Sequence, residues 1–247
     1  RQAEREPVAL EFSFNAGGVS ARGYTADLSP QGALLVAEAD EALTGRQIAL
    51  TLDRVGQIDA VVRGVSPLGI HVQFARLSPA AEQSLARILA ESRQADRPYV
   101  ELCQSVAAEI AGVFEQALAA RRIDEPVLFH NRYDAIAGTD PQQYLSASTE
   151  ICESVLPGVI ERAKRSDQRI IFCVASDRNG YVAVHHPEVS QPQRPGDSVS
   201  NMATSRNRRI YDDRAAILAA RNPNPILVQT YLRDLGRGKT VLKEFDA

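Results

Sequence analysis

The first part of the chain, residues 7–75, consists of short stretches in which apolar and polar residues alternate. Phe12 and Phe14 belong to one such stretch, and turn residues at positions 15–18 follow it. A period of two places apolar side chains on one face of a strand, and several short strands with regular turn signals are typical of a sandwich or barrel. We therefore predict an all-β domain with strands over residues 8–14, 19–26, 33–37, 45–52, 58–65 and 69–74.

A helix is predicted to follow the last of these strands. Ser78 can act as its N-cap and Pro79 can occupy its first position, while apolar residues at positions 85, 88 and 89 form one face. Residues 92–98 are polar and end in proline, which is typical of a domain boundary. The predicted domains are residues 1–95 and residues 99–247.

Beyond residue 99 the period of the apolar positions changes from two to about 3.6. One helix is predicted over residues 99–121, and a second begins near Pro141. Two hairpins follow, with turns at residues 177–180 and 234–238. Helices followed by hairpins favour an α+β domain with an antiparallel sheet.

Composition limits the partners of the protein. The chain has 247 residues, enough for two modest domains, and a net charge of −3. It therefore has no basic field for DNA, RNA or an anionic membrane surface, and no stretch of about 18 uncharged apolar residues that would insert into a membrane. No secretory signal is visible. Cys103, Cys152 and Cys173 show no CxxC spacing, which favours reduced thiols in a cytoplasmic protein.

Two short motifs suit a ligand that carries phosphates and guanine rings. Arg1 and Arg5 form an RxxxR motif, and Asp27, Ser29 and Gly32 form a DxSxxG motif. Guanidinium groups bind phosphate in a fork, stack on flat rings and match the O6/N7 edge of guanine. A carboxylate accepts from guanine N–H groups, and a hydroxyl can donate or accept. The alternative is that the arginines are solvated charges and the second motif is an ordinary turn.

Together, in this order and at the start of a small β-rich domain, the motifs resemble those of the PilZ family of cyclic di-GMP receptors. The resemblance implies a barrel closed by a C-terminal helix, with cyclic di-GMP as ligand and no other cofactor. Arg1 and Arg5 would hold phosphate and stack on guanine. Asp27 and Ser29 would bind a guanine edge, and Gly32 would permit the turn.

The N-terminal segment is expected to change on binding. Residues 1–6 contain a single apolar residue, Ala3, so they bury too little surface to order themselves. We expect this segment to fold over the ligand when the phosphates arrive. Arg63 and His71 are expected to line the barrel near this site.

The second part of the chain resembles a segment in the cytoplasmic regions of bacterial methyl-accepting chemotaxis proteins, which is similar to Cache/PAS-type sensor folds. The family segment usually continues through a further strand, and this chain lacks the long methylated coiled coil because it has no sustained heptad run. The resemblance covers residues 99–247 and implies a sensory module. The resemblance rests on the sequence segments at residues 133–141, 177–181, 186–191, 206–213 and 229–236.

No catalytic or metal site is predicted. His185 and His186 are adjacent on a predicted strand, so they point to opposite faces, and the ligand spacing of zinc sites is absent. The sequence contains no GxSxG nucleophile elbow, P-loop or GxGxxG motif. We therefore expect a protein that is not an enzyme.

An arginine-rich segment leaves two alternatives open. Arg206, Arg208 and Arg209 lie close to Asp212 and Asp213, and such clusters commonly form structural ion pairs. The other alternative is a pocket for a carboxylate or another anion. The candidate residues of this second-domain pocket are Tyr181, Arg206, Arg209, Tyr231 and Arg233.

These observations favour a bacterial cyclic di-GMP receptor and effector in the cytoplasm. Nucleotide binding would be coupled to a second sensory or docking domain and to a signalling protein partner, in the control of motility or chemotaxis. The alternative is a protein-interaction module without nucleotide binding, in which the helix at residues 99–121 forms a homodimer or docks to a partner.

Overall fold

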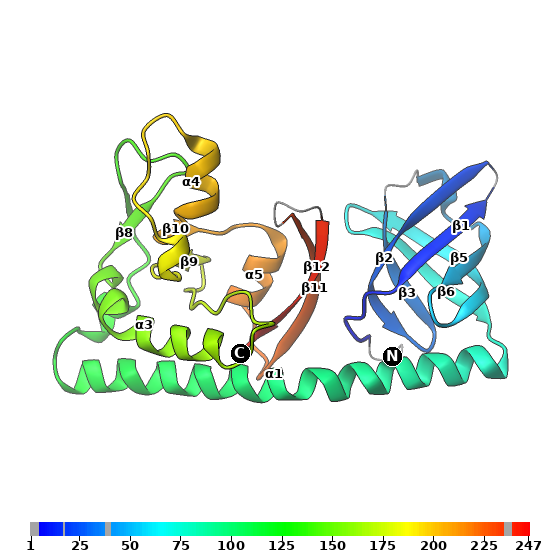
Figure 1. The fold of residues 1–247 in the computed structure, drawn as a ribbon, viewed down its shortest axis with the longest axis horizontal. Helices are drawn as coiled ribbons and strands as arrows, with labels where there is room; N and C mark the ends of the chain where they lie inside the picture. The colour runs from blue at the N-terminus through cyan, green and yellow to red at the C-terminus, as the bar shows by residue number, and fades with distance from the viewer. Residues whose placement is uncertain (1–4, 17, 38–40, 235–238) are drawn as a thin grey trace. The chain divides into compact units, whose positions relative to one another are not determined.

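Six antiparallel strands of the N-terminal part form a closed barrel in the computed structural model (Figure 1). The structure describes residues 5–16, 18–37, 41–234 and 239–247, without the side chains of residue 41 and residues 232–240. The predicted all-β barrel is confirmed. Around the barrel the strands follow in the order β1 (Glu11–Ala16), β2 (Val19–Ser29), β3 (Gly32–Val36), β6 (Gly69–Arg76), β5 (Gly56–Ser66) and β4 (Gln47–Leu52), with a short 3-10 helix, η1 (Glu41–Leu43), before β4.

The alternation in the sequence becomes the inside and outside of the barrel. Phe12 and Phe14 of β1 are buried, whereas Ser13 between them is exposed. The helix after the barrel adds Leu85 and Ile88 to the same core, so its predicted apolar face is confirmed. Burying each such side chain contributes about 1.5–3 kcal/mol, and this burial determines which face of each strand is left to bind a ligand.

The helix that follows the barrel is longer than predicted. Helix α1 (Pro79–Ala119) has 41 residues and contains Pro98. The prediction that residues 92–98 interrupt the helix is therefore wrong. These residues are polar but include good helix formers such as alanine, arginine and glutamine, and the cost of one internal proline, about 3 kcal/mol, is offset by the helix on both sides.

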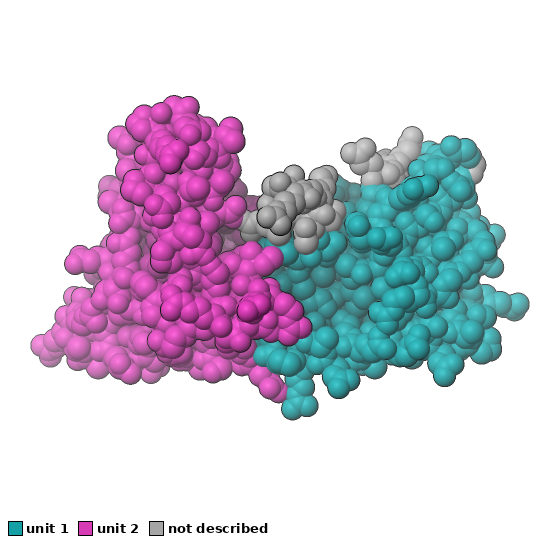
Figure 2. Space-filling view, in the orientation of Figure 1, with its two compact units in different colours: residues 1–99, 228–245 teal, residues 100–227, 246–247 magenta. Residues whose placement is uncertain are grey.

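The chain divides into two compact units within α1 (Figure 2). The first comprises residues 1–99 and 228–245, and the second comprises residues 100–227 and 246–247. The hairpin of β11 (Leu227–Asp234) and β12 (Lys239–Asp246) thus lies mostly in the first unit. The compact units differ from the predicted domains in the placement of this hairpin, and the independence of the domains stays a prediction.

Contacts with the barrel and with the first part of α1 hold the hairpin. The Thr230 hydroxyl donates to the Ala26 carbonyl oxygen at 2.6 Å, and Lys243 Nζ pairs with Asp96 at 2.7 Å. The Phe245 ring stacks on the Tyr99 ring of α1, with the ring centroids 5.5 Å apart. These contacts join residues more than a hundred positions apart, so local sequence patterns could not predict them.

The second unit consists of short helices and small sheets. Its core gathers Leu156 and Ile160 of one helix against Tyr181, Ala183 and Val184. The elements are α2 (Glu125–Leu128), β7 (Tyr133–Ala135), β8 (Tyr144–Ser146), α3 (Thr149–Arg165), β9 (Tyr181–Val182), η2 (Pro187–Val189), α4 (Ser198–Thr204), β10 (Arg209–Ile210) and α5 (Arg214–Ala220).

Helix α3 begins at Thr149, later than the predicted start near Pro141. The Thr139 hydroxyl donates to the Ile136 carbonyl oxygen at 2.7 Å and accepts from the Gln143 amide at 2.9 Å. Such local bonds compete with helix formation. The segment forms a turn and strand β8 instead.

In addition to the barrel, the described residues form three separate two-stranded sheets, rather than the one antiparallel sheet expected for residues 99–247. The turn at residues 177–180 is confirmed, because the Gly180 amide donates to the Asp177 carbonyl oxygen at 3.0 Å. However, Tyr181 pairs with Ile210 of β10, and residues 168–176 form no strand. Strand pairing here depends on a distant partner, and the Cache/PAS-like fold stays a prediction.

Within the described part of the chain, no helix combines the length and the apolar character needed to cross a membrane.

Candidate functional site

The two predicted motifs meet at the end of strand β2. Glu6 and Leu28 exchange two backbone hydrogen bonds of 2.8 Å, which places the side chain of Arg5 beside Asp27. Arg5 Nη1 donates to Asp27 Oδ1 at 2.6 Å. Asp27 Oδ1 also accepts from the Leu34 amide at 3.1 Å. The other predicted arginine of this motif, Arg1, lies outside the described residues.

A bulge determines how Asp27 is presented. The pairing of β2 with β3 shifts in register between Thr25 and Asp27, and bulges commonly redirect a side chain. The next residue, Leu28, points into the core and is fully buried. Asp27 therefore lies on the outer surface of the barrel, where a ligand can reach it.

Ser29 and Gly32 close the turn between β2 and β3. The Ser29 hydroxyl donates to the Gly32 carbonyl oxygen at 3.2 Å and accepts from the Gln31 amide at 3.3 Å. Only one lone pair of this buried hydroxyl remains for a ligand. Gly32 has no left-handed φ, but a Cβ there would lie 2.2 Å from the Val72 carbonyl oxygen. Glycine is thus required by the close approach of β3 to β6, which differs from its predicted role in the turn.

Further polar side chains continue this surface across the barrel. Register places Leu34 opposite His71 and Gly32 opposite Gln73 on β6. His71 Nε2 lies 2.9 Å from the Ser66 hydroxyl, and Arg63 Nε donates to Gln73 Oε1 at 2.7 Å. The surface that these side chains form is called here the outer polar face, and it consists of Arg5, Asp27, Arg63, His71 and Gln73.

The outer polar face suits an anion. It holds two guanidinium groups, those of Arg5 and Arg63, against the carboxylate of Asp27, and such a balance attracts negative charge. Gln73 was not among the predicted residues. The alternation of Gln73 with the buried residues Val72 and Phe74 along β6 could have indicated that its side chain faces outward.

The segment before β1 is already attached to the rest of the unit. The Thr25 hydroxyl donates to the Val8 carbonyl oxygen at 2.5 Å, and Arg93 of α1 donates to Glu6 at 2.6 Å. Backbone pairing of Glu6 with β2 can supply ordering that apolar burial could not, and the expectation that residues 1–6 become ordered with ligand stays a prediction.

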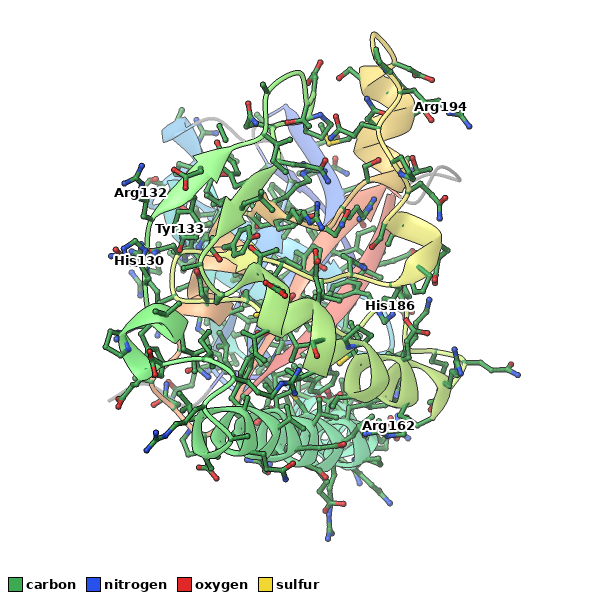
Figure 3. The ribbon with its side chains drawn as sticks, turned by 90° about the vertical axis from the view of Figure 1, so that its left-hand side faces the viewer. His130, Arg132, Tyr133, Arg162, His186 and Arg194 are labelled. Carbon is green, nitrogen blue, oxygen red and sulfur yellow. The ribbon has the colours of Figure 1, made fainter. Side chains whose placement is uncertain are left out.

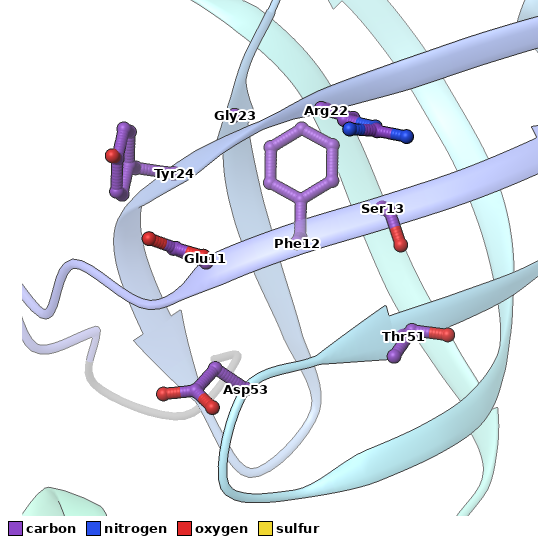
Figure 4. Close-up of a pocket in the computed structure, with 8 residues that line it drawn as sticks. All are labelled: Glu11, Phe12, Ser13, Arg22, Gly23, Tyr24, Thr51 and Asp53. Atoms are coloured by element: carbon purple, nitrogen blue, oxygen red, sulfur yellow. The ribbon is translucent and has the colours of Figure 1, made fainter.

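Apart from the outer polar face, a hollow of about 530 Å³ lies on the outer surface of β1, β2 and β4 (Figure 4). Glu11, Tyr24 and Asp53 lie toward one end of it, and Arg22 lies toward the other. None of the predicted ligand residues lines it. Two carboxylates against one guanidinium would repel a doubly charged anion, so this hollow does not suit a cyclic dinucleotide.

The candidate residues of the second-domain pocket have separate environments. The Tyr181 hydroxyl is buried between Thr149 Oγ1 at 2.9 Å and the Tyr144 carbonyl oxygen at 3.0 Å, and burial raises the pKa of this tyrosine. Tyr231 belongs to the first unit, and the side chain of Arg233 lies outside the described residues.

The arginine-rich segment forms local contacts. Arg206 Nε donates to the Ala203 carbonyl oxygen at 3.2 Å, and the Arg209 guanidinium lies over the Tyr211 ring at 5.1 Å. Arg208 pairs with Glu153 of α3 at 2.7 Å, and this hydrogen bond raises the pKa of Arg208. Asp213 instead caps helix α5 through the Ala215 and Ala216 amides.

The adjacent histidines have different roles. His186, which is labelled in Figure 3, is buried, and its Nε2 accepts from the Cys173 amide at 2.9 Å. Its proton therefore lies on Nδ1 and is donated to Glu161 Oε1 at 2.5 Å, and this bond lowers the pKa of Glu161. Among the residues described, no group of three or more histidine, cysteine or acidic side chains could hold a metal ion.

Comparison with known proteins identifies the N-terminal part of the chain. Residues 1–91 match the family model described as PilZ domain, so the barrel and the first part of α1 are a PilZ domain. The search of curated proteins gives no match.

Two solved structures are similar over part of the chain. Bacillus subtilis inhibitor of motility (MotI/DgrA) is 18% identical over 39% of this chain and 51% of its own, with a TM-score of 0.33. The PilZ domain with c-di-GMP of YcgR from Escherichia coli is 20% identical over 41% of this chain and 97% of its own, with a TM-score of 0.32. The chain thus spans about half the length of the MotI structure.

Proposed function

We propose that the PilZ domain of this chain binds cyclic di-GMP on the outer polar face and acts as a receptor that performs no chemistry. The observation that carries the proposal is the pairing of Arg5 with Asp27, which joins two motifs 22 positions apart at one edge of that face. The match of residues 1–91 to the PilZ model supports the same ligand class.

Arg5 is proposed to bind a phosphate of the ligand. A guanidinium group has five N–H donors, and the described contact with Asp27 uses one of them. The ion pair holds the guanidinium in place, and this reduces the entropy that binding would otherwise cost. A second positive charge on the same face, Arg63, favours the second phosphate.

Asp27 is proposed to recognise a guanine edge. Its Oδ1 atom accepts from Arg5 and from the Leu34 amide, while Oδ2 has no hydrogen bond with any described residue. That oxygen can accept from the N–H groups of guanine. Ser29 contributes mainly by holding the turn, with one lone pair available for the ligand.

As an effector, the protein is proposed to pass ligand binding on through contacts within the first unit. Glu6 follows Arg5 directly and pairs with Arg93 of α1. Asp96, one turn further along α1, pairs with Lys243 of the hairpin. A ligand that moves Arg5 therefore acts on α1 and the hairpin, provided that it binds one arrangement more tightly than the other.

The partner protein and the second sensory or docking unit stay part of the proposal, as does a role in motility or chemotaxis. They rest on the resemblance of residues 99–247 to a segment of chemotaxis proteins. A homodimer through residues 99–121 is a further proposal. Analytical ultracentrifugation can measure whether the chain self-associates, stably or reversibly.

Calorimetric titration of the full chain with cyclic di-GMP tests the proposal. Cyclic di-AMP is the matched ligand without the guanine edge, and we expect it to bind more weakly. Arg5→Ala should weaken cyclic di-GMP binding, whereas Arg22→Ala, an exposed arginine outside the outer polar face, should not.

Two results would contradict the proposal. Equal binding by the Arg5→Ala variant and the unchanged chain would place the ligand elsewhere. Chromatography of the ligand after incubation should return it intact, and hydrolysis by the purified chain would refute a receptor without chemistry.

A further inference from the structure

Two rows of outward side chains line the hollow of about 530 Å³ on the barrel, with β1 as its middle strand (Figure 4). In β1, Glu11 and Ser13 are exposed, whereas Phe12 between them is buried. Glu11 pairs with Tyr24 of β2, and its carbonyl oxygen accepts from the amide of Asp53, just after β4, at 2.9 Å. Residues directly opposite in a sheet lie on the same face. Tyr24, Glu11 and Asp53 thus form the first row.

The second row lies two residues further along β1, which corresponds to about 7 Å. Ser13 pairs with Arg22 on one side and with Thr51 on the other, so this row holds a guanidinium group and two hydroxyl groups. Figure 4 shows the Arg22 guanidinium toward the end of the hollow that lies away from Glu11. The hollow therefore has an acidic end and a basic end.

The two carboxylates of the acidic end are not neutralised within the described part of the chain. Neither Glu11 nor Asp53 forms an ion pair there, and the neighbouring Arg54 pairs with Glu91 instead. The Cβ atoms of directly opposite residues are about 4.5–5.5 Å apart, so both carboxylates can reach one cationic group. Like charges in such positions destabilise a sheet, and a bound cation would remove this cost.

Tyr24 adds an aromatic ring to the acidic end. Its side chain is exposed and lies directly opposite Glu11. A guanidinium group can stack on such a ring and donate two parallel hydrogen bonds to a carboxylate. An ammonium group is a compact charge without this planar fork. The acidic end therefore suits a guanidinium group better than an ammonium group.

We propose that this hollow binds a small molecule with a guanidinium group at one end and a carboxylate at the other, joined by a short aliphatic chain. Glu11 and Asp53 would receive the guanidinium group, Tyr24 would stack on it, and Arg22 would receive the carboxylate. The volume lies within the range of about 300–1,000 Å³ that is common for ligand sites. No residue of the outer polar face lines the hollow, so the proposal does not depend on cyclic di-GMP binding.

Three probes of similar size test the two ends separately. L-Arginine carries both groups, L-citrulline replaces the guanidinium group by a neutral urea, and agmatine lacks the carboxylate. Each is titrated into the full chain, and binding is followed by saturation-transfer NMR. We expect saturable binding of L-arginine and weaker binding of both analogues. Equal or tighter binding of either analogue, or no saturable binding of L-arginine, would overturn the proposal.

A variant pair tests the assignment of the acidic end. Asp53→Asn should weaken L-arginine binding about two- to fivefold, the range for an exposed ion pair. Asp59→Asn is the matched control, since Asp59 is exposed on β5 and does not line the hollow. Equal weakening by both variants would refute the assignment. Circular dichroism checks their folding, and if Asp53→Asn unfolds, the order of the three probes on the unchanged chain decides.

Arg22→Gln tests the basic end. This variant should bind L-arginine and agmatine equally, because the group that distinguishes a carboxylate from its absence is removed. A preference for L-arginine that persists in Arg22→Gln would refute the role of Arg22. The three probes and cyclic di-GMP are titrated separately, so failure of this proposal is distinguished from failure of nucleotide binding.

Discussion

Asp27 offers a way to separate its structural contribution from its proposed contribution to binding. One of its oxygens accepts from both Arg5 and the Leu34 amide. Asp27→Asn keeps an oxygen acceptor but removes the charge, whereas Asp27→Ala removes both. The two variants should therefore differ in stability while losing ligand binding alike.

The magnitudes follow from burial. The side chains of Arg5 and Asp27 are 35% and 28% exposed, and such a pair contributes about 0–1 kcal/mol. Asp27→Asn should thus cost no more than about 1 kcal/mol. Asp27→Ala also leaves the amide of the buried residue Leu34 without its acceptor, which costs about 1–3 kcal/mol.

Calorimetry and hydrogen exchange provide the assays. A loss of 1 kcal/mol corresponds to a melting-temperature decrease of about 4–8 °C for a domain of this size. Exchange at the Leu34 amide should accelerate in Asp27→Ala and much less in Asp27→Asn. Cyclic di-GMP binding should weaken about 5- to 150-fold in both variants, from the 1–3 kcal/mol of a matched base contact.

The binding role and the structural role of Asp27 can be refuted separately. If Asp27→Asn binds cyclic di-GMP as tightly as the unchanged chain, the carboxylate does not recognise guanine. If exchange at Leu34 is the same in both variants, the hydrogen bond to Asp27 does not hold β2 and β3 together.

Three further predictions concern stability. Gly32→Ala should lower the melting temperature, because its Cβ would lie 2.2 Å from a carbonyl oxygen, whereas Gly64→Ala, with open space around it, should not; equal effects would contradict the close-approach argument. The second unit should lose stability as pH falls below about 6.5, because His185 binds a proton in the unfolded chain but stays neutral in the folded unit, where its pKa is lowered to about 3. The melting temperature of His185→Gln should depend less on pH, and an unchanged pH profile would contradict this prediction. A fragment of residues 1–99 should fold, because all buried members of the barrel core lie between Val8 and Leu89; aggregation of this fragment would show that the hairpin is needed.

Helix α1 shows where sequence patterns mislead. Polar residues ending in a proline predicted a boundary at residues 92–98, yet the helix continues through them. Polarity reports exposure to solvent, not the end of a helix. Asp96 lies in this stretch and pairs with Lys243, a partner from the far end of the chain that no local pattern could reveal.

The sequence alone determined the strands of the barrel and the identity of most residues on its candidate binding surface. It could do so because burial on one face gives every strand a period of two, as at Phe12 and Phe14. Only the tertiary structure decided that Arg5 is already paired with Asp27, that Gly32 is required by its neighbour β6, and that the hairpin contacts β2 through Thr230. These features depend on residues distant in sequence, and such contacts arise from packing of the whole unit rather than from local periodicity.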